Sequence, residues 1–238
     1  MKIPKKLTII IPAFNEAKTI RNCVQRVQKA SAYGLKKEII VVNDASTDKT
    51  SQILKSKKNI KLINHRQNKG KGAAIKSGLR IARGDIILIQ DADLEYNPSD
   101  YELLLEPIVT GNADVVYGSR FLSHRPHRVL YFKHTLGNKI LTAFSNLLTD
   151  LNLTDMETGY KVFKKEVIKK ILPNLKSDRF GFEPEVTARV AKLAKKDGIR
   201  IYEVGISYFG RTYKEGKKIN WKDGMKAFGE IIKYNLFD

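Results

Sequence analysis

Leu-Thr-Ile-Ile-Ile-Pro, at residues 7–12, is an almost entirely apolar run close to the start of the chain. An apolar run without polar alternation is typical of a β-strand that is buried on both faces. Strands of this kind belong to parallel sheets that carry helices on both sides. The run therefore predicts an α/β protein.

Helices and strands alternate after this run through the first half of the chain. The predicted helices are Thr19–Ala30, Lys49–Lys55, Gly72–Ala82 and Ser99–Val109, and the predicted strands are Glu38–Val42, Ile60–Asn64, Asp85–Ile89 and Ala113–Gly118. We expect Ser46 or Thr47 to cap the second helix. Such alternation indicates βαβ units and a mostly parallel sheet, which binds its ligands at the carboxyl ends of the strands.

The second half of the chain is less regular. Its predicted helices are Thr135–Leu148, Glu183–Lys195 and Trp221–Leu236, and its predicted strands are Tyr160–Phe163 and Ile199–Val204. Repeats, low-complexity segments and Pro/Ser linkers are absent from the sequence. We therefore expect a single domain at residues 1–212, with an amphipathic helix at residues 213–238 that packs on this domain or extends from it.

Composition excludes several classes of protein. The 238 residues, 42% apolar and 29% charged, have the balance of a folded globular chain. Cys23 is the only cysteine, which excludes a disulfide framework and a cysteine-based zinc site. The sequence holds no HExxH motif, no run long enough to span a membrane and no signal-peptide pattern. These observations predict a reduced, cytoplasmic chain.

The net charge of +19, from 44 Lys and Arg against 25 Asp and Glu, is unusually high. An excess of this size indicates an anionic partner such as a nucleotide, a phosphate, a nucleic acid or a membrane surface. The alternative is solvated lysine spread over the whole surface. Charge alone therefore identifies no function.

Acidic residues follow three of the predicted strands. Glu16 follows the first strand, Asp44 the second, and Asp91, Asp93 and Glu95 the fourth. Clustered carboxylates repel one another unless a cation lies between them. An extended backbone would project the last three to one side, where oxygen ligands suit Mg²⁺ or Mn²⁺. The alternative is a turn of solvated acids.

A glycine-rich stretch, Gly70-Lys71-Gly72-Ala73, precedes the third helix. It follows the third strand and lacks the third glycine of a dinucleotide site, and it does not match a P-loop. We interpret the glycines as a close approach of the backbone at a helix start near a phosphate or sugar, with a plain turn as the alternative.

Several motifs occur together in a characteristic order. They are residues 9–16 (IIIPAFNE), 42–48 (VNDASTD), 68–72 (NKGKG), 91–93 (DAD), 118–121 (GSRF), 155–163 (DMETGYKVF) and 209–211 (FGR). In this order they resemble family 2 inverting glycosyltransferases, and within that family the dolichyl-phosphate or polyprenyl-phosphate mannose synthases. The resemblance covers residues 7–216 and implies the GT-A fold, a Rossmann-like, mostly parallel sheet flanked by helices.

The resemblance also implies roles for individual residues. The residues that would bind the sugar-nucleotide donor are Pro12, Phe14, Glu16, Asp44, Asp91, Ala92, Asp93, Arg211 and Lys217. Asp93, with Asp91 and Glu95, would hold Mg²⁺ or Mn²⁺ on the diphosphate. Asp93, Arg120 and Arg211 would be catalytic. Asp93 would act through the metal, and the two arginines would contact phosphates. Phe14 stands where many relatives have tyrosine, and Glu95 where they often have glutamine.

A lipid phosphate is the acceptor that fits these residues best. A sugar hydroxyl needs a base to take its proton, whereas a phosphate monoester, with a second pKa of about 6, is already mostly dianionic at neutral pH. Between Arg120 and Lys139 the chain carries several basic residues and no acidic one. Asp155, Glu157 and Glu183 remain as possible bases should the acceptor be a hydroxyl.

We therefore expect a metal-dependent transfer of a hexose, mannose from GDP-mannose, to a polyprenyl phosphate. The alternatives are a family 2 enzyme that uses UDP-glucose or a hydroxyl acceptor on a cell-surface glycan, and a basic nucleic-acid-binding protein, for which no specific motif exists.

A polyprenyl phosphate stays in the bilayer, so we expect peripheral docking on the cytoplasmic face of an anionic membrane or a membrane-embedded partner subunit. Two predicted helices carry apolar stripes, which are Leu136, Ile140, Phe144 and Leu147 in one and Trp221, Met225, Phe228 and Ile232 in the other. Arg125 and Arg128 precede the first. The alternative is that both stripes pack on the sheet as core.

Overall fold

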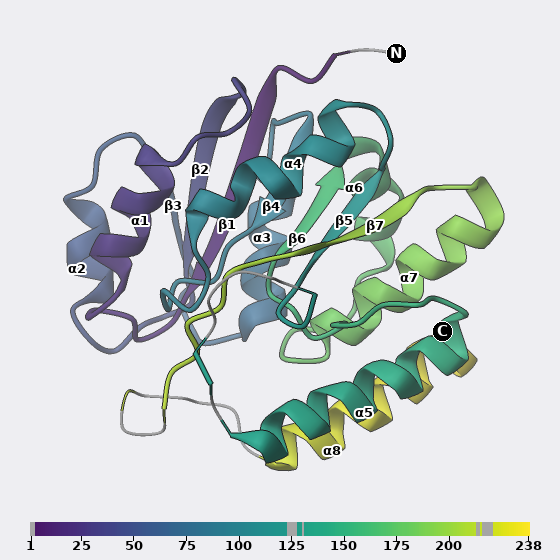
Figure 1. Ribbon diagram of the computed structural model, residues 1–238. Coiled ribbons are helices and arrows are strands. Elements are labelled where there is room, and N and C mark those ends of the chain that lie inside the picture. Colours follow the sequence, from purple (N-terminus) through teal and green to yellow (C-terminus); the bar gives the residue numbers. More distant parts are fainter. Residues whose placement is uncertain (1–2, 123–127, 130, 213–214, 216–220) are drawn as a thin grey trace.

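The structure is a computed structural model that describes residues 3–122, 128–129, 131–212, 215 and 221–238 (Figure 1). Its sheet has the strand order β3-β2-β1-β4-β6-β5-β7. The strands are β1 (Lys6–Ala13), β2 (Lys36–Asn43), β3 (Lys61–Asn64), β4 (Ile86–Ile89), β5 (Val115–Ser119), β6 (Lys161–Lys164) and β7 (Ile201–Gly205). Neighbours pair in parallel except that β6 runs antiparallel to both β4 and β5. The predicted α/β fold with a mostly parallel sheet is confirmed.

The helices match the predicted ones closely. They are α1 (Ile20–Lys29), α2 (Thr50–Lys55), α3 (Lys71–Ile81), α4 (Tyr101–Val109), α5 (Phe132–Thr149), α6 (Lys165–Ile171), α7 (Phe182–Asp197) and α8 (Trp221–Ile232). Short 3₁₀ turns at Pro98–Asp100 and Leu172–Asn174 and a π turn at Lys233–Phe237 complete the regular structure. Helix α6, which directly follows β6, is an element that the sequence pattern does not predict.

The central strand β1 explains how the two faces are covered. Ile9 and Ile11 are fully buried against a cluster that contains residues of α1, α2 and α4. Ile10 points to the other face and packs with residues of α3, α5, α6, α7 and α8. Helix α3 comes so close that a Cβ at Gly78 would lie 2.6 Å from the Ile10 side chain. Burial of one strand on both faces therefore follows from the apolar run that predicts the fold.

The predicted cap of α2 is wrong. The carboxylate of Asp48 accepts the N–H of Thr50 at 2.9 Å, so Asp48 satisfies the start of this helix. Ser46 instead accepts the N–H of Asn15, and Thr47 donates to the side chain of Asn15. Both predicted caps therefore tie the loop after β2 to the loop after β1.

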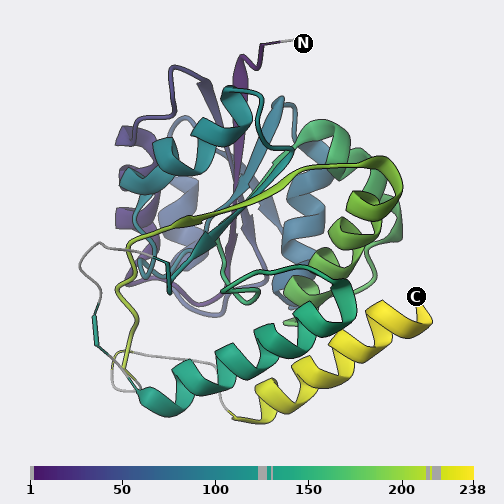
Figure 2. The same ribbon diagram turned by 45° about the vertical axis from the view of Figure 1, so that its right-hand side comes forward.

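Helices α5 and α8 lie side by side beyond the carboxyl ends of the central strands (Figures 1 and 2). The rings of Phe144 and Phe228 join them, with centroids 5.3 Å apart. Among the described residues, no helix is long and apolar enough to cross a membrane. The predicted division at residue 212 falls beside residues outside the described part of the chain and stays a prediction, while α8 packs on α5 and α7.

Candidate active site

A cavity of about 1120 Å³ lies between the carboxyl ends of the strands and the α5–α8 pair. Ten of the residues singled out in the sequence line it: Pro12, Phe14, Glu16, Asp44, Asp91, Ala92, Asp93, Glu95, Arg120 and Arg211. Lys217, the other residue that the resemblance assigns to the donor, lies outside the described residues. The strand-end rule for parallel sheets thus locates the cavity, and the chain brings the ten together from the end of β1 and from the segments that follow β1, β2, β4, β5 and β7.

The acidic stretch after β4 forms a turn. Leu94 has a φ of +66°, and the carboxylate of Asp93 accepts the N–H of Glu95 at 3.1 Å. The prediction that an extended backbone projects Asp91, Asp93 and Glu95 to one side is therefore wrong. A short aspartate side chain that accepts a backbone N–H two residues on favours a turn over an extended chain.

Arg211 lies among three acidic side chains from the loop after β1 and the turn after β4. Its guanidinium is 3.0 Å from Asp93, 3.3 Å from Glu95 and 3.6 Å from Glu16. Its backbone N–H also donates to Glu95 at 2.9 Å. The cation that clustered carboxylates require is thus supplied by the chain itself.

The compensation of this negative charge is incomplete. Burial raises the pKa of Asp93 to about 7, repulsion from Asp91 and Glu95 adds to the rise, and Arg211 only partly offsets it. Among the described residues, no group of three or more His, Cys, Asp or Glu side chains is arranged to hold a metal ion. Carboxylate oxygens are nevertheless the donors that Mg²⁺ and Mn²⁺ prefer, and a raised carboxylate pKa marks a place where further positive charge would be stabilising.

Asp44 anchors the loop that leads into α3. Its carboxylate lies 2.6 Å from the His65 ring, accepts 2.9 and 2.7 Å hydrogen bonds from Asn68 and the N–H of Gly70, and also accepts the N–H of Lys69. Asp44 is 2% exposed, so most of its hydrogen-bonding capacity is taken by this loop. His65, which the sequence reasoning missed, lies far from Asp44 in sequence and belongs to no motif.

Lys71 lies on the wall of the cavity at the start of α3. Its ammonium group pairs with Asp91 at 2.9 Å and with Glu183 at 2.8 Å. Sequence reasoning noted Lys71 only as part of the glycine-rich stretch, and its two partners are distant in sequence. This pair of contacts joins the turn after β4 to the start of α7.

The glycines around Lys71 allow a close approach, as predicted, but to the protein's own backbone. Gly70 has a φ of +103°, and a Cβ on it would overlap the carbonyl oxygen of Asp178. A Cβ on Gly72 would lie 2.5 Å from the carbonyl oxygen of Ser177. At these two positions the close approach is to the segment before α7, and the expected approach to a phosphate or sugar stays a prediction.

Arg120 is held rigidly at the cavity. Its Nε and Nη2 each lie 2.6 Å from the carboxylate of Asp155, and its guanidinium lies 5.3 Å and 5.6 Å from the ring centres of Tyr208 and Phe121. Asp155 is fully buried, and its own N–H donates to Glu203 at 3.0 Å. Asp155 is thus the fixed partner of an arginine, which removes it from the candidate bases.

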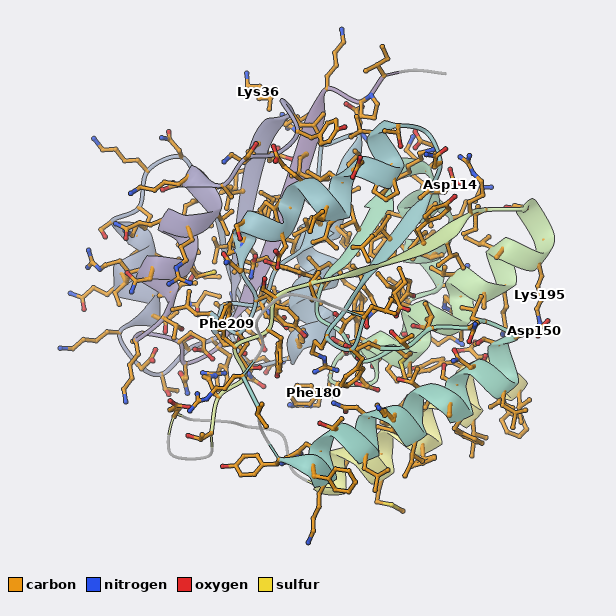
Figure 3. The ribbon with its side chains drawn as sticks, viewed as in Figure 1. Lys36, Asp114, Asp150, Phe180, Lys195 and Phe209 are labelled. Atoms are coloured by element: carbon orange, nitrogen blue, oxygen red, sulfur yellow. The ribbon has the colours of Figure 1, made fainter. Side chains whose placement is uncertain are left out.

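The opposite end of the cavity is basic and apolar. Lys133 and Lys139 line it together with apolar side chains of α5, α8 and the segment before α7, namely Leu141, Met225, Phe228 and Phe180. Figure 3 shows Phe180 between the sheet and α5. Arg128 also lines the cavity, but beside the segment that carries Arg211: it donates to the carbonyl oxygen of Gly210 at 3.1 Å and pairs with Glu215 at 2.7 Å. Arg125 lies outside the described residues. One end of the cavity is therefore acidic and the other is basic with apolar walls.

Comparison with known proteins identifies the family. The model of glycosyl transferase family 2 matches residues 8–172. The chain belongs to glycosyl transferase family 2. The expected resemblance is thereby confirmed, and the chain is a glycosyltransferase.

Two relatives show how far the similarity extends. UDP-N-acetylglucosamine–dolichyl-phosphate N-acetylglucosaminyltransferase of Methanococcus voltae is 30% identical, over 96% of this chain and 95% of the relative. A dolichyl-phosphate beta-glucosyltransferase of Trichomonas vaginalis is 29% identical, over 97% of this chain and 73% of the relative. The similarity covers the whole fold, α5 and α8 included.

A solved structure confirms the GT-A fold. Glucosyl-3-phosphoglycerate synthase of Mycobacterium tuberculosis, crystallised with Mn²⁺, UDP and glucosyl-3-phosphoglycerate, superposes with a TM-score of 0.73 at 18% identity, covering 97% of this chain and 80% of that one.

Proposed function

We propose that this glycosyltransferase moves a hexose from a nucleoside-diphosphate sugar to a polyprenyl phosphate such as dolichyl phosphate, with inversion at the anomeric carbon and dependence on Mg²⁺ or Mn²⁺. The observation that carries the proposal is one cavity with an acidic end and a basic, apolar end. A diphosphate with its metal suits the first end, and a phosphate on a hydrocarbon chain suits the second.

The donor would lie over the carboxyl ends of β1, β2 and β4. Pro12, Phe14, Glu16, Asp44 and Ala92 surround the space for the base and ribose. Because Asp44 is occupied by its own loop, we assign to it the placing of that loop against the nucleotide in addition to any direct contact.

The metal would be held by Asp93, with Asp91 and Glu95 beside it. When bound, a divalent cation neutralises the diphosphate that leaves. Each of these carboxylates now faces a cation of the chain, Lys71 or Arg211. Relieved of its contact with Asp93, Arg211 can turn its planar fork to the phosphates, which it matches bidentately.

The acceptor needs no base. One of its phosphate oxygens attacks the anomeric carbon as the bond from that carbon to the donor's phosphate oxygen breaks, and the electron pair leaves with the nucleoside diphosphate. No proton moves in this step, so positioned cations are what the site must supply. Arg120, fixed by Asp155, is placed to hold one phosphate, and Lys217 remains a proposed phosphate contact.

The names of the relatives favour a UDP-linked donor. The sequence resemblance favoured GDP-mannose, whereas the two named relatives transfer N-acetylglucosamine and glucose. We therefore propose UDP-N-acetylglucosamine or UDP-glucose as the donor, and GDP-mannose becomes the comparison in the test.

We propose that α5 and α8 dock on the cytoplasmic face of a membrane. Both helices carry apolar side chains that the solvent reaches, which we call the α5–α8 stripes: Phe132, Leu136, Ile140 and Leu147 on α5, and Met225, Ile232, Leu236 and Phe237 on α8 and its last turn. Leu147 is 78% and Phe237 81% exposed. The alternative of core packing thus fails for these side chains and holds for Phe144 and Phe228, which meet each other. Nearby lysines would add attraction to anionic lipid of about 1 kcal/mol each.

A donor screen tests this function. The protein is incubated with UDP-glucose, UDP-N-acetylglucosamine or GDP-mannose, with Mg²⁺ or Mn²⁺, and with a short polyprenyl phosphate. We expect a lipid-linked hexose from one UDP-sugar. A product from GDP-mannose alone would restore the mannose expectation, and transfer only to a glycan hydroxyl would replace the acceptor. Absence of every product would contradict the proposal.

A further inference from the structure

One carboxylate oxygen of a residue that lines the cavity has no hydrogen-bond partner. Glu157, in the segment between α5 and β6, lines the cavity, and its Oε1 is buried without any partner. A buried polar atom without a partner is destabilising, so native proteins keep few of them. A ligand group that hydrogen-bonds to Glu157 would therefore stabilise this side chain.

Hydrogen bonds hold the backbone around Glu157 in place. The ammonium group of Lys161, itself 1% exposed, donates to the carbonyl oxygens on either side, those of Met156 and Thr158. The N–H of Met156 donates to Thr142 of α5 at 3.1 Å. The segment thus presents Glu157 to the cavity from a rigid support, as a specific binding residue requires.

The groups that face Glu157 are charged and capable of hydrogen bonding. Burial raises its pKa to about 7, repulsion from Glu183 adds to the rise, and Lys161 and Arg120 partly offset it. Glu183 in turn pairs with Lys71 at 2.8 Å. A carboxyl group poised between its two protonation states can accept or donate a hydrogen bond, which suits a neutral hydroxyl better than a phosphate.

The position also fits the sugar part of the donor. Lys71 links Glu183, the neighbour of Glu157, to Asp91, and Asp91 begins the acidic turn beside which we place the metal and diphosphate. The hexose is the part of the donor that is attached to this diphosphate. The wall formed by Glu157, Glu183 and Lys71 therefore adjoins the proposed position of the diphosphate.

We propose that Glu157 is a specificity residue that hydrogen-bonds a hydroxyl or the acetamido N–H of the transferred hexose, and so reads the sugar and not the nucleotide. The inference rests on the proposed function, because it assumes a sugar-nucleotide donor in this cavity. It predicts that changes at Glu157 separate affinity for the nucleotide sugar from affinity for the nucleotide.

Calorimetric titration tests this separation. Wild-type protein, Glu157→Gln and Glu157→Leu are titrated with UDP, UDP-glucose, UDP-N-acetylglucosamine, GDP and GDP-mannose in the presence of Mn²⁺. We expect the affinity for UDP to stay within twofold in all three, and the affinity for the UDP-sugar relative to UDP to fall by about tenfold or more in Glu157→Leu, as for one lost hydrogen bond to a charged group. Glu157→Gln, which keeps one acceptor and adds a donor, is expected to lose less.

Two controls keep the outcomes distinct. Glu106→Leu, on the exposed side of α4 and away from the cavity, should leave every affinity unchanged. Preserved UDP binding shows that each variant is folded. An unchanged ratio of UDP-sugar to UDP affinity in Glu157→Leu would overturn this inference alone, whereas wild-type protein that binds none of the five compounds would overturn the proposed function together with it.

Discussion

The guanidinium of Arg211 lies within 3.6 Å of three carboxylates, which come from the loop after β1 and the turn after β4. In the protein without substrate this arginine neutralises the acids that we assign to metal binding. With metal and donor present, the acids gain a divalent cation and the arginine gains phosphates. One residue thus pairs with the carboxylates in the structure and, in the proposed mechanism, stabilises the leaving diphosphate.

A positive charge at position 211 is not expected to be sufficient for full activity. Arg211→Lys is expected to lose roughly 100-fold in kcat/KM, almost as much as Arg211→Ala, because a lysine cannot make the bidentate contact. Arg200→Lys is the matched control, since Arg200 also pairs with a carboxylate, that of Asp114, but lies away from the cavity. Steady-state kinetics on purified variants measures both. Full activity in Arg211→Lys would refute the phosphate contact.

Asp93→Asn is expected to keep or raise the stability of the protein and to reduce its activity. Because the pKa of Asp93 is raised, its ionised form is disfavoured in the folded protein, and Asp93→Asn should keep or raise the melting temperature. The same change removes a proposed metal ligand and should reduce transfer on the order of 10³-fold. EDTA should abolish the wild-type reaction. Asp150→Asn, at a left-handed position that asparagine tolerates, is the control. Full transfer in EDTA would disprove the metal assignment.

Residue types at the site could be predicted from the sequence, but their partners could not. Strand-end acids and motif order predict ten residues of the cavity wall. The pairs Lys71–Glu183 and Arg120–Asp155 join residues far apart in the chain, so spacing carries no sign of them. The turn at residues 91–95 depends on the left-handed conformation of Leu94, for which a leucine gives no signal.

Individual elements are tied together by charged hydrogen bonds as well as by apolar packing. Glu38 on β2 accepts hydrogen bonds from Thr8 on β1 and Lys61 on β3, at 2.6 and 2.7 Å. It also accepts the N–H of Arg83, just before β4, at 2.8 Å. A single buried carboxylate thus fastens three adjacent strands at the end of the sheet opposite the cavity.

Glu38 predicts a specific dependence of stability on pH. Burial would raise its pKa, but the hydrogen bonds from Lys61, Thr8 and Arg83 outweigh burial and lower it from 4.5 to about 2. The stabilisation is therefore complete above pH 4.5 and lost as the pH falls through about 2. Glu38→Gln should lower the free energy of unfolding at neutral pH by about 1–2 kcal/mol.

Urea denaturation at a series of pH values measures this difference, with Glu106→Gln as the exposed control. The gap between wild type and Glu38→Gln should close as the pH falls from 4.5 toward 2. A gap that stays constant over this range would show that the charge of Glu38 is not what stabilises the strands.

The α5–α8 stripes predict binding to anionic vesicles. Wild-type protein should float with liposomes that contain anionic lipid, less so at high salt. Ile140→Glu with Leu147→Glu should abolish flotation, because both side chains are exposed on α5, whereas Tyr202→Glu, an exposed aromatic side chain on β7, should not. Wild-type protein that stays in solution at every salt concentration would instead require a membrane-embedded partner subunit.

Helix and strand positions could be predicted because each element has its own period of apolar residues. The direction of β6 could not, since a short apolar segment carries no information about the orientation of its neighbours. Helix α6 was not predicted, because its seven residues follow β6 without a break and are rich in lysine. The sequence also could not predict whether the apolar stripe of α5 is exposed, because the same helical period of apolar residues occurs in helices that pack on a core and in helices that bind a surface.

At the scale of the whole molecule, the cavity is where the two halves of the chain meet. The first half supplies the acidic strand ends, and the second half supplies α5, α8 and the segment that carries Arg211. The charge of +19 is thus combined with a local excess of acid at one end of the cavity. In the proposed function, this division would bring a metal-bound diphosphate and a lipid phosphate into one cavity, as direct transfer between them requires.

The central claim is that a phosphate, and not a hydroxyl, is the acceptor, and a matched pair of lipids tests it most directly. Purified protein with Mn²⁺ and its preferred sugar nucleotide is given either a polyprenyl phosphate or the corresponding polyprenol, and the product's anomeric configuration is determined by NMR. The proposed function predicts a hexosyl phosphate of inverted configuration from the first lipid and no product from the second. Equal transfer to the polyprenol, or retention of configuration, would contradict it.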